Sequence, residues 1–330
     1  MNSLPTWILS QTTPPVIPIL AYPGAALVDY FPKDLVTDPT VQFHAQRALH
    51  ARYNTQVLLT AMDLSLEAEA FGCELSWSDM EPPTVIGRLV SSRAEAEAMA
   101  VPQVGSGRAS VPIETTRRLV AEFPRVPILA GMIGPFSLAA RLFGVSETLA
   151  LTLEDPELTG LLVDKATSFL IEQASHLKKA GAWGVLVAEP TAGLLSPRGL
   201  REWSSAAVRK LTDAVQEEGF SVILHNCAAR PVHLPAILQA GAAGYHFGAP
   251  MDLEQALQAV PPNTIICGNL DPARIFVHSD PCEVAEAARQ LLAKHRRHKN
   301  FVLSSGCDIP AKTSLDVLDA FFATVGSFPC

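Results

Sequence analysis

The sequence predicts an α/β protein built as a single (β/α)8 TIM-type barrel, with an excursion after the second strand. Three observations favour this fold class. Eight short apolar runs recur along the 330 residues, helical patterns separate most of them, and no glycine-rich phosphate-binding fingerprint follows the first run. An open, doubly wound sheet is the competing arrangement, and the number of runs favours the barrel. We expect residues 1–330 to form one domain, because no convincing linker divides the chain.

The eight apolar runs are continuous rather than alternating, which is typical of parallel strands buried on both faces. Each run ends in glycine, proline or a polar residue. In chain order they are VIPILAYPG (16–24), QVLLTAMD (56–63), VPILAGMIGP (126–135), WGVLVAEP (183–190), FSVILHNCA (220–228), AAGYHFGAP (242–250), TIICGNLDP (264–272) and FVLSSGCDIP (301–310).

The segments between the runs are mostly helical in pattern. Residues 157–181 and 197–219 each end in glycine after a polar or charged turn, as a helix C-terminus does. Residues 64–125 depart from this rhythm and are predicted to form an excursion over one face of the barrel. The longest apolar stretch, 126–144, contains Pro127, Pro135 and Arg141, so we interpret it as a buried strand followed by a helix rather than a membrane span.

Composition excludes several classes of protein. With 25 Lys and Arg against 33 Asp and Glu, the net charge is −8, and no basic surface is indicated that would bind nucleic acid. Six cysteines in 330 residues do not make a disulfide scaffold. The first residues lack the positively charged region of a secretory signal. We therefore expect a cytoplasmic protein with reduced cysteines that contacts neither nucleic acid nor membrane.

Polar side chains collect where the apolar runs end. In a barrel, the carboxyl ends of the strands meet at one mouth, where active sites form. The residues at these positions are Asp63, Glu67 and Glu69 near the second run, Glu189 at the fourth, His225 and Cys227 at the fifth, Tyr245 and His246 at the sixth, Asn269 and Asp271 at the seventh, and Cys307 and Asp308 at the eighth.

His225, Cys227 and Cys307 are candidate metal ligands. Two residues apart on a strand, His225 and Cys227 point to the same side of the sheet, and Cys307 ends another strand. Imidazole and thiolate bind zinc, and three protein ligands with one open position are typical of a catalytic zinc site. The alternative is that the cysteines are small buried hydrophobic residues and the histidine is a satisfied core group.

The carboxylates are less clear from the residues alone. Glu189 fits a fourth zinc ligand, a general base, or a charge at a helix N-terminus ahead of Pro190. Glu67 and Glu69 fit the solvated first turn of a helix, and Asp271 fits a turn cap before a proline. The other cysteines are interpreted as structural or incidental: Cys73, Cys267, Cys282 and Cys330.

Seven segments, in order across about residues 55 to 325, resemble the uroporphyrinogen decarboxylase superfamily. They are MDLSLEAEAFGCEL, GMIGPFSLAARLFG, AEPTAGLLSPRGL, ILHNCA, GYHFG, GNLDP and LSSGCDIP. The branch they resemble most is that of the cobalamin-dependent methyltransferases, of the methylcobalamin:coenzyme M and chloromethane-utilisation type. The resemblance implies a (β/α)8 barrel, in agreement with the number of apolar runs.

This resemblance also implies the site. It implies that His225, Cys227 and Cys307 hold Zn2+. By its location we expect Glu189 to be the fourth ligand, with Asp308 in reserve, and we expect His225, Cys227, Cys307 and Glu189 to be the catalytic residues. A zinc-bound thiolate would then take a methyl group from cobalt. For the corrinoid we expect contacts at the barrel mouth from Asp63, Gly134, Tyr245, His246, Asn269 and Asp271. Because the D-x-H-x-x-G signature is absent, the corrinoid is expected as a transient co-substrate, free methylcobalamin or a corrinoid protein.

The function expected from the resemblance is zinc-dependent methyl transfer between a methylcorrinoid and a thiol such as coenzyme M. One alternative keeps the corrinoid but uses tetrahydrofolate or a methoxylated or methylated small molecule. Another is a uroporphyrinogen-type decarboxylase. That branch carries an arginine-rich segment near its N-terminus, whereas the corresponding segment here, ILAYPGAALVDYFPKDL, has no arginine. The last alternative is a non-catalytic corrinoid carrier.

Overall fold

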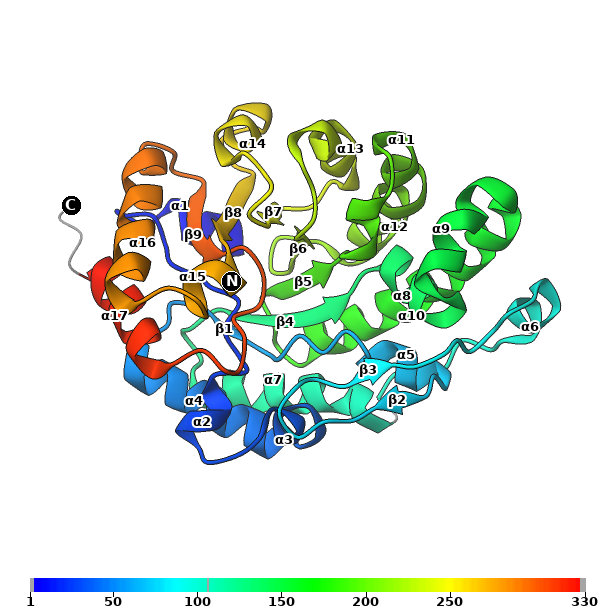
Figure 1. The fold of residues 1–330 in the computed structure, drawn as a ribbon, viewed down its shortest axis with the longest axis horizontal. Helices are drawn as coiled ribbons and strands as arrows, with labels where there is room; N and C mark the ends of the chain where they lie inside the picture. Colours follow the sequence, from blue (N-terminus) through cyan, green and yellow to red (C-terminus); the bar gives the residue numbers. More distant parts are fainter. Residues whose placement is uncertain (1–2, 106, 327–330) are drawn as a thin grey trace.

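A computed structural model describes residues 3–105 and 107–326. Its centre is a curled parallel sheet with the strand order β1-β4-β5-β6-β7-β8-β9, surrounded by helices (Figure 1). The strands are β1 (Leu58–Leu59), β4 (Ile128–Ile133), β5 (Gly184–Ala188), β6 (Ser221–Asn226), β7 (Gly244–Phe247), β8 (Ile265–Leu270) and β9 (Phe301–Ser305). This arrangement confirms the predicted α/β fold class, with a strand of the sheet in seven of the eight apolar runs.

The first apolar run lies beside β9 but is not a strand of the ladder. Val16 forms an isolated parallel bridge with Leu303, and the Ile17 N–H donates to the Leu303 carbonyl at 2.9 Å. Pro15 and Pro18 lack an N–H group, so a longer ladder cannot form here. In the described residues no ladder joins this run to β1, where Val16 instead donates to the Gln56 side chain. The prediction of eight strands was therefore wrong for the first run.

The helices alternate with the strands along the chain. Their bounds are α1 (Leu4–Leu9), α2 (Gly24–Leu27), α3 (Pro32–Thr37), α4 (Pro39–Tyr53), α5 (Leu66–Phe71), α6 (Arg93–Ala98), α7 (Val111–Glu122), α8 (Pro135–Phe143), α9 (Val145–Glu154), α10 (Pro156–Lys179), α11 (Pro197–Gly199), α12 (Ala206–Val215), α13 (Leu234–Ile237), α14 (Leu253–Ala259), α15 (Pro272–Phe276), α16 (Pro281–His295) and α17 (Leu315–Gly326). The helix predicted over 157–181 is α10. The helix predicted over 197–219 comprises α11, a π-helical segment (Leu200–Ser205) and α12.

The excursion after the second strand is confirmed. Between β1 and β4 the chain forms α5, the antiparallel pair β2 (Leu75–Ser76) and β3 (Thr84–Val85), α6 and α7. Figure 1 shows β2 and β3 in cyan, outside the ring of strands. The excursion thus adds a wall beside the barrel rather than a strand to it.

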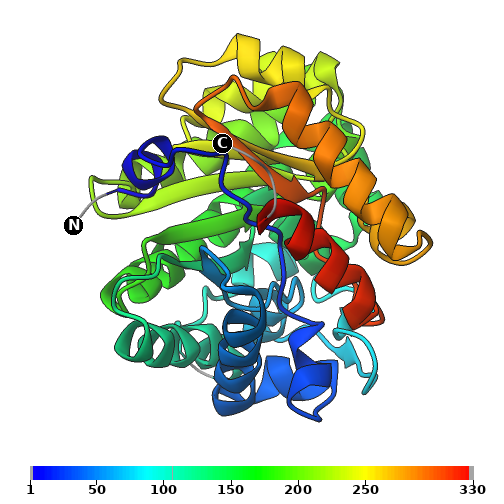
Figure 2. The same ribbon diagram turned by 90° about the vertical axis from the view of Figure 1, so that its left-hand side faces the viewer.

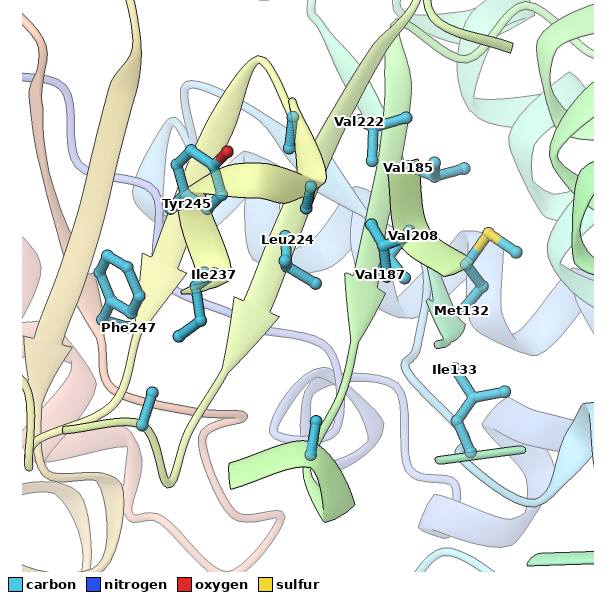
Figure 3. Packing of buried hydrophobic residues seen from close by; sticks show 14 of the residues in the cluster. Met132, Ile133, Val185, Val187, Val208, Val222, Leu224, Ile237, Tyr245 and Phe247 are labelled. Atoms are coloured by element: carbon cyan, nitrogen blue, oxygen red, sulfur yellow. The ribbon is translucent and has the colours of Figure 1, made fainter. Parts of the chain in front are cut away.

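The core has two layers, one outside the sheet and one inside the barrel. The outer layer packs sheet residues against the helices, as Figure 3 shows for Val185, Val222 and Leu224. The inner layer is formed by strand residues such as Leu186 and Ile223, which pack against Leu4 and Ile8 of α1 and against these further residues: Leu59, Leu129, Ile265 and Val302. These strand residues lie toward the strand starts, so α1, dark blue in Figure 2, covers the N-terminal end and leaves the C-terminal mouth open.

The apolar stretch 126–144 forms β4 and α8, as predicted. Eight of the nine residues of α8 are buried, all except Arg141. In the described part of the chain, no single helix is long and apolar enough to cross a membrane. Only α8 and α9 taken together pass that test, and they are bent by 105° where they meet.

Candidate metal centre

Three predicted ligands come together at the C-terminal ends of β6 and β9. His225 lies near the end of β6, Cys227 follows that strand, and Cys307 follows β9. Their donor atoms lie within 4.8 Å of one another. The loop after β7 packs closely on Cys227, since a Cβ added at Gly248 would lie 2.0 Å from the Cys227 carbonyl oxygen. A side chain at residue 248 would therefore displace a ligand.

His225 has one ring nitrogen in use and one without a partner. Its Nδ1 lies 2.9 Å from Nδ1 of His246, whereas its Nε2 is buried and has no hydrogen-bond partner. A buried polar atom without a partner is costly in an ordinary core. A metal ion bound at Nε2 would remove that cost.

A chain of hydrogen bonds determines which nitrogen of His225 carries the proton. The Ser304 hydroxyl donates to the Ile17 carbonyl at 2.7 Å, so its oxygen accepts from His246 Nε2 at 2.8 Å. Burial holds the pKa of His246 well below its usual range, so the ring is neutral and its Nδ1 is an acceptor. His225 must then donate through Nδ1, which leaves a lone pair on Nε2.

This arrangement gives His246, a predicted corrinoid contact, partners within the protein. The side chain is buried inside the barrel, and both of its nitrogens bind protein groups. In this structure its Nδ1 contacts His225 and orients that ring. A histidine that binds a metal usually donates its other ring N–H to a neighbouring group, and in a metal-bound His225 that group would be His246.

The two thiols interact with each other. A hydrogen bond from Cys307 lowers the pKa of the Cys227 thiol, and nearby His225 lowers it further. The thiolate is the form of cysteine that binds metal. The donor set of one imidazole and two sulfurs fits Zn2+, with a fourth position left for another ligand.

Glu189, the predicted fourth ligand, is not in this group. Its Oε1 accepts from the Phe136 N–H at 3.0 Å, and its Oε2 accepts from the Ser137 N–H at 2.9 Å and the Ser137 hydroxyl at 2.6 Å. The carboxylate therefore lies at the N-terminus of α8, where a negative charge is stabilised. Burial nonetheless raises the pKa of Glu189 to about 6.

Gly134 lies against this carboxylate. A Cβ at residue 134 would lie 2.4 Å from Cγ of Glu189, so only glycine leaves room for the side chain. The structure thus relates Gly134 to Glu189 rather than to a corrinoid.

The reserve ligand Asp308 has a buried Oδ1 with no hydrogen-bond partner, and burial raises the pKa of this carboxyl.

Three other predicted corrinoid contacts have structural partners. Tyr245 packs in the layer between sheet and helices (Figure 3), and its hydroxyl donates to the Leu238 carbonyl, so the structure gives it a packing role. The Asn269 amide donates to the carbonyls of Gly248 and Met251, which holds the loop after β7. The Asp271 carboxylate accepts from two N–H groups at the start of α15 and is its N-cap, the alternative reading of this residue.

Asp63 belongs to an ion-pair cluster that sequence reasoning missed. Arg108 pairs with both Asp63 and Glu69, and its guanidinium lies over the Trp77 ring, 4.8 Å from the centroid. The Asp63 Oδ1 accepts from the N–H and hydroxyl of Ser65. The carboxylate at the end of β1 is thus fully engaged. No spacing in the sequence pairs Arg108 with it, because they are 45 residues apart.

A cavity of about 790 Å3 opens beside the metal centre. It lies among the N-terminal segment, the β2–β3 excursion and the residues after Cys307, and its lining is mostly apolar. The lining includes Tyr22, Met62, Val85, Arg141, Asp308 and Ile309. A volume of this size holds drug-sized ligands.

The remaining described cysteines lie outside the metal group. Cys73 and Cys267 are buried, and burial raises the pKa of their thiols to about 11 and about 12 respectively. Cys282 is exposed on α16. Cys330 lies outside the described residues.

The chain is similar to known proteins over most of its length. The family model described as Uroporphyrinogen decarboxylase (URO-D) matches residues 10–328. A methylcobamide:CoM methyltransferase MtbA of Methanosarcina acetivorans is 28% identical over 268 residues, covering 80% of this chain and 77% of its own. A uroporphyrinogen decarboxylase of Myxococcus xanthus is 27% identical over 254 residues, covering 74% of this chain and 69% of its own.

The fold itself has a close structural match. A solved methyltransferase from Methanosarcina mazei superimposes with a TM-score of 0.88 over 99% of both chains, at 22% sequence identity. This match shows that the two chains share the barrel fold.

Proposed function

The chain belongs to the uroporphyrinogen decarboxylase family, and from that premise we propose that it is a corrinoid-dependent methyltransferase. Its homologues include methylcobamide:CoM methyltransferases. In the proposed reaction, a thiol acceptor loses its proton and its sulfur takes the methyl group. The corrinoid leaves with the electron pair of the cobalt–carbon bond.

One observation carries the proposal: His225, Cys227 and Cys307 place their donor atoms within 4.8 Å of one another, with Nε2 of His225 left without a partner. These three residues would hold zinc. Bound zinc would supply the chemistry of thiol activation, because coordination deprotonates a thiol that is mostly protonated at neutral pH. Three protein ligands leave one position for the acceptor. We propose no ligand role for Glu189, whose oxygens accept from the start of α8.

The protein would contribute binding and exclusion of water. The cavity beside Asp308 is lined largely by apolar side chains, which suits the reaction of a desolvated thiolate. The corrinoid is proposed to approach this mouth as free methylcobalamin or on a corrinoid protein, and to leave after each turnover. The cytoplasmic location expected from the cysteine content stays a prediction.

A decarboxylase of the same family is the second candidate, because relatives of both kinds match the chain. The N-terminal part of the cavity lining argues against it, because the decarboxylase branch carries its arginines near the N-terminus. The N-terminal segment contributes Tyr22, Ala25, Ala26, Tyr30, Phe31 and Pro32, and none of these is an arginine that could bind a porphyrinogen carboxylate. A decarboxylase would also leave the cluster of His225, Cys227 and Cys307 without a role.

The test is metal analysis combined with a methyl-transfer assay. We expect about one zinc per chain, and loss of both zinc and transfer in Cys227→Ser and Cys307→Ser. Cys282→Ser changes an exposed cysteine and is the matched control. Loss of methylcobalamin is followed with coenzyme M, homocysteine and tetrahydrofolate in parallel, and a uroporphyrinogen-type substrate tests decarboxylation. Full activity in zinc-free protein would contradict the proposal.

A further inference from the structure

Arg141 is a cation without a partner in the wall of the mouth cavity. It is the one residue of α8 that is not buried, and it lines the cavity together with Leu64 and Val85. Among the described residues, its guanidinium forms no hydrogen bond, ion pair or cation–π contact. The side chain is half-buried, and the loss of water on burial lowers the pKa of Arg141.

Arg108, the other arginine close to the mouth, is compensated. Its guanidinium pairs with Asp63 and Glu69, at a side-chain exposure of 10%. A half-buried guanidinium with no counter-charge is unfavourable, because the charge has lost water without gaining a partner. Arg141 therefore lacks what Arg108 has, an anion.

No other charged group of the cavity supplies that anion. Glu81 and Lys312 are exposed at its edge, and Asp308 lies beside the metal centre. None of the three forms an ion pair with Arg141 in the described residues. The rest of the lining is mostly apolar, so a bound molecule could supply the anion that the protein does not.

We propose that Arg141 binds the anionic end of the methyl acceptor, a carboxylate, sulfonate or phosphate. This inference rests on the proposed function and names its substrate class. The cavity extends from Arg141 to Asp308, the residue after Cys307. One molecule can therefore reach the metal centre with its thiol while its acidic end faces Arg141. A guanidinium matches such anions through two parallel N–H donors.

The experiment compares two thiols of equal length that differ in charge. Methyl transfer from methylcobalamin is measured with 3-mercaptopropanoate and with 3-mercaptopropan-1-ol, for the wild type, Arg141→Gln and Arg141→Lys. In Arg141→Gln we expect the KM of the anionic thiol to rise roughly tenfold to a hundredfold, as for a lost charged hydrogen bond. The KM of the neutral thiol should stay the same, and Arg141→Lys should fall between. Equal changes for both thiols would overturn the proposal.

Two controls support the comparison. Arg201→Gln removes an exposed arginine of the π-helical segment, outside the mouth cavity, and should change neither KM. Circular dichroism and thermal unfolding establish that each variant is folded. An effect of Arg201→Gln equal to that of Arg141→Gln would overturn the proposal, because it would reflect net charge alone.

The corrinoid is a second source of the same chemistry, because a cobamide carries a phosphodiester in its nucleotide loop. Methylcobinamide lacks that loop and is compared with methylcobalamin at fixed thiol concentration. If Arg141→Gln weakens the use of methylcobalamin alone, Arg141 binds the corrinoid phosphate and the acceptor assignment is overturned.

A binding measurement separates this inference from the proposed function. Propane-1-sulfonate has no thiol, and its affinity is measured by calorimetry for the wild type and Arg141→Gln. Weaker binding to the variant supports the anion site even if the wild type transfers no methyl group, a result that would overturn the proposed function alone. If wild type and Arg141→Gln bind propane-1-sulfonate equally, and the wild type transfers methyl groups to the anionic and the neutral thiol with the same KM, the anion site alone is overturned.

Discussion

At the scale of single residues, the candidate centre depends on groups that do not belong to it. His225 presents a free lone pair because His246, Ser304 and the Ile17 carbonyl form a chain in which each donor has one acceptor. Neutral imidazole has two tautomers, and only one of them leaves Nε2 available. Neutral His246 is thus a positioning residue.

Removing the Ser304 hydroxyl should weaken metal binding. In Ser304→Ala, His246 loses its acceptor and can take the other tautomer, which competes with the productive one at His225. We expect zinc affinity, measured by competition with a chelator, to fall roughly tenfold to a hundredfold. Ser168→Ala, on the exposed side of α10, is the control. Unchanged zinc affinity in a folded Ser304→Ala protein would show that the hydrogen-bond chain through His246 does not affect metal binding.

Glu67 gives a pH dependence of stability. Burial raises its pKa to about 8, and its Oε2 has no partner. The folded protein therefore keeps a proton that the unfolded chain releases near its usual pKa of about 4.3. The resulting stability is fully present below that pKa and is lost as the pH rises toward about 8.

The substitution Glu67→Gln should remove this dependence. The amide keeps the shape of the protonated acid and has no proton to lose. Between about pH 5 and about pH 8, we expect the free energy of unfolding to fall more steeply with pH in the wild type than in Glu67→Gln. The two slopes should differ by at most about 1.4 kcal/mol per pH unit. Urea unfolding at several pH values measures it, with exposed Glu122→Gln as control. Parallel curves for wild type and Glu67→Gln would contradict the assignment.

At the scale of elements, α8 links the sheet to the mouth. Its N-terminus receives the carboxylate of Glu189 from the end of β5, and Arg141 lies toward its other end, facing the cavity. The helix was predictable from its sequence pattern. The carboxylate that accepts from the N–H groups at its start could not be predicted, because Glu189 lies 53 residues from Phe136.

A methyl group at residue 134 should disturb this junction. In Gly134→Ala, the new Cβ would lie 2.4 Å from Cγ of Glu189 and must displace that side chain. Overpacking of this kind costs about 1 to 3 kcal/mol of unfolding free energy. Gly160→Ala on α10 has no atom within 4 Å of its new Cβ and should be neutral or slightly stabilising. Urea unfolding compares the two, and an equal effect would rule out the steric argument.

At the scale of the whole molecule, one hydrophobic cluster extends from Val16 to Phe321 and includes residues of most helices and strands. We predict on this basis that residues 1–330 unfold as one domain, although the chain ends lie outside the described residues. Circular dichroism and tryptophan fluorescence should give coincident single transitions in urea. Two separated transitions would show that the excursion or another part forms a separate unit.

The sequence by itself determined seven of the eight predicted strands, the helical pattern between them, and the three soft donors His225, Cys227 and Cys307. Apolar periodicity and donor chemistry are local properties, so they can be read along the chain. Only the tertiary structure decided the roles of His246, Glu189 and Tyr245, and the isolation of Arg141. His246 and Glu189 depend on partners far away in sequence, and the hydrogen-bond chain of His246 ends with Ser304 and Ile17, which are 287 residues apart. Which way a side chain points, and which partner it contacts, is decided only when folding of the barrel brings residues that are distant in sequence into contact.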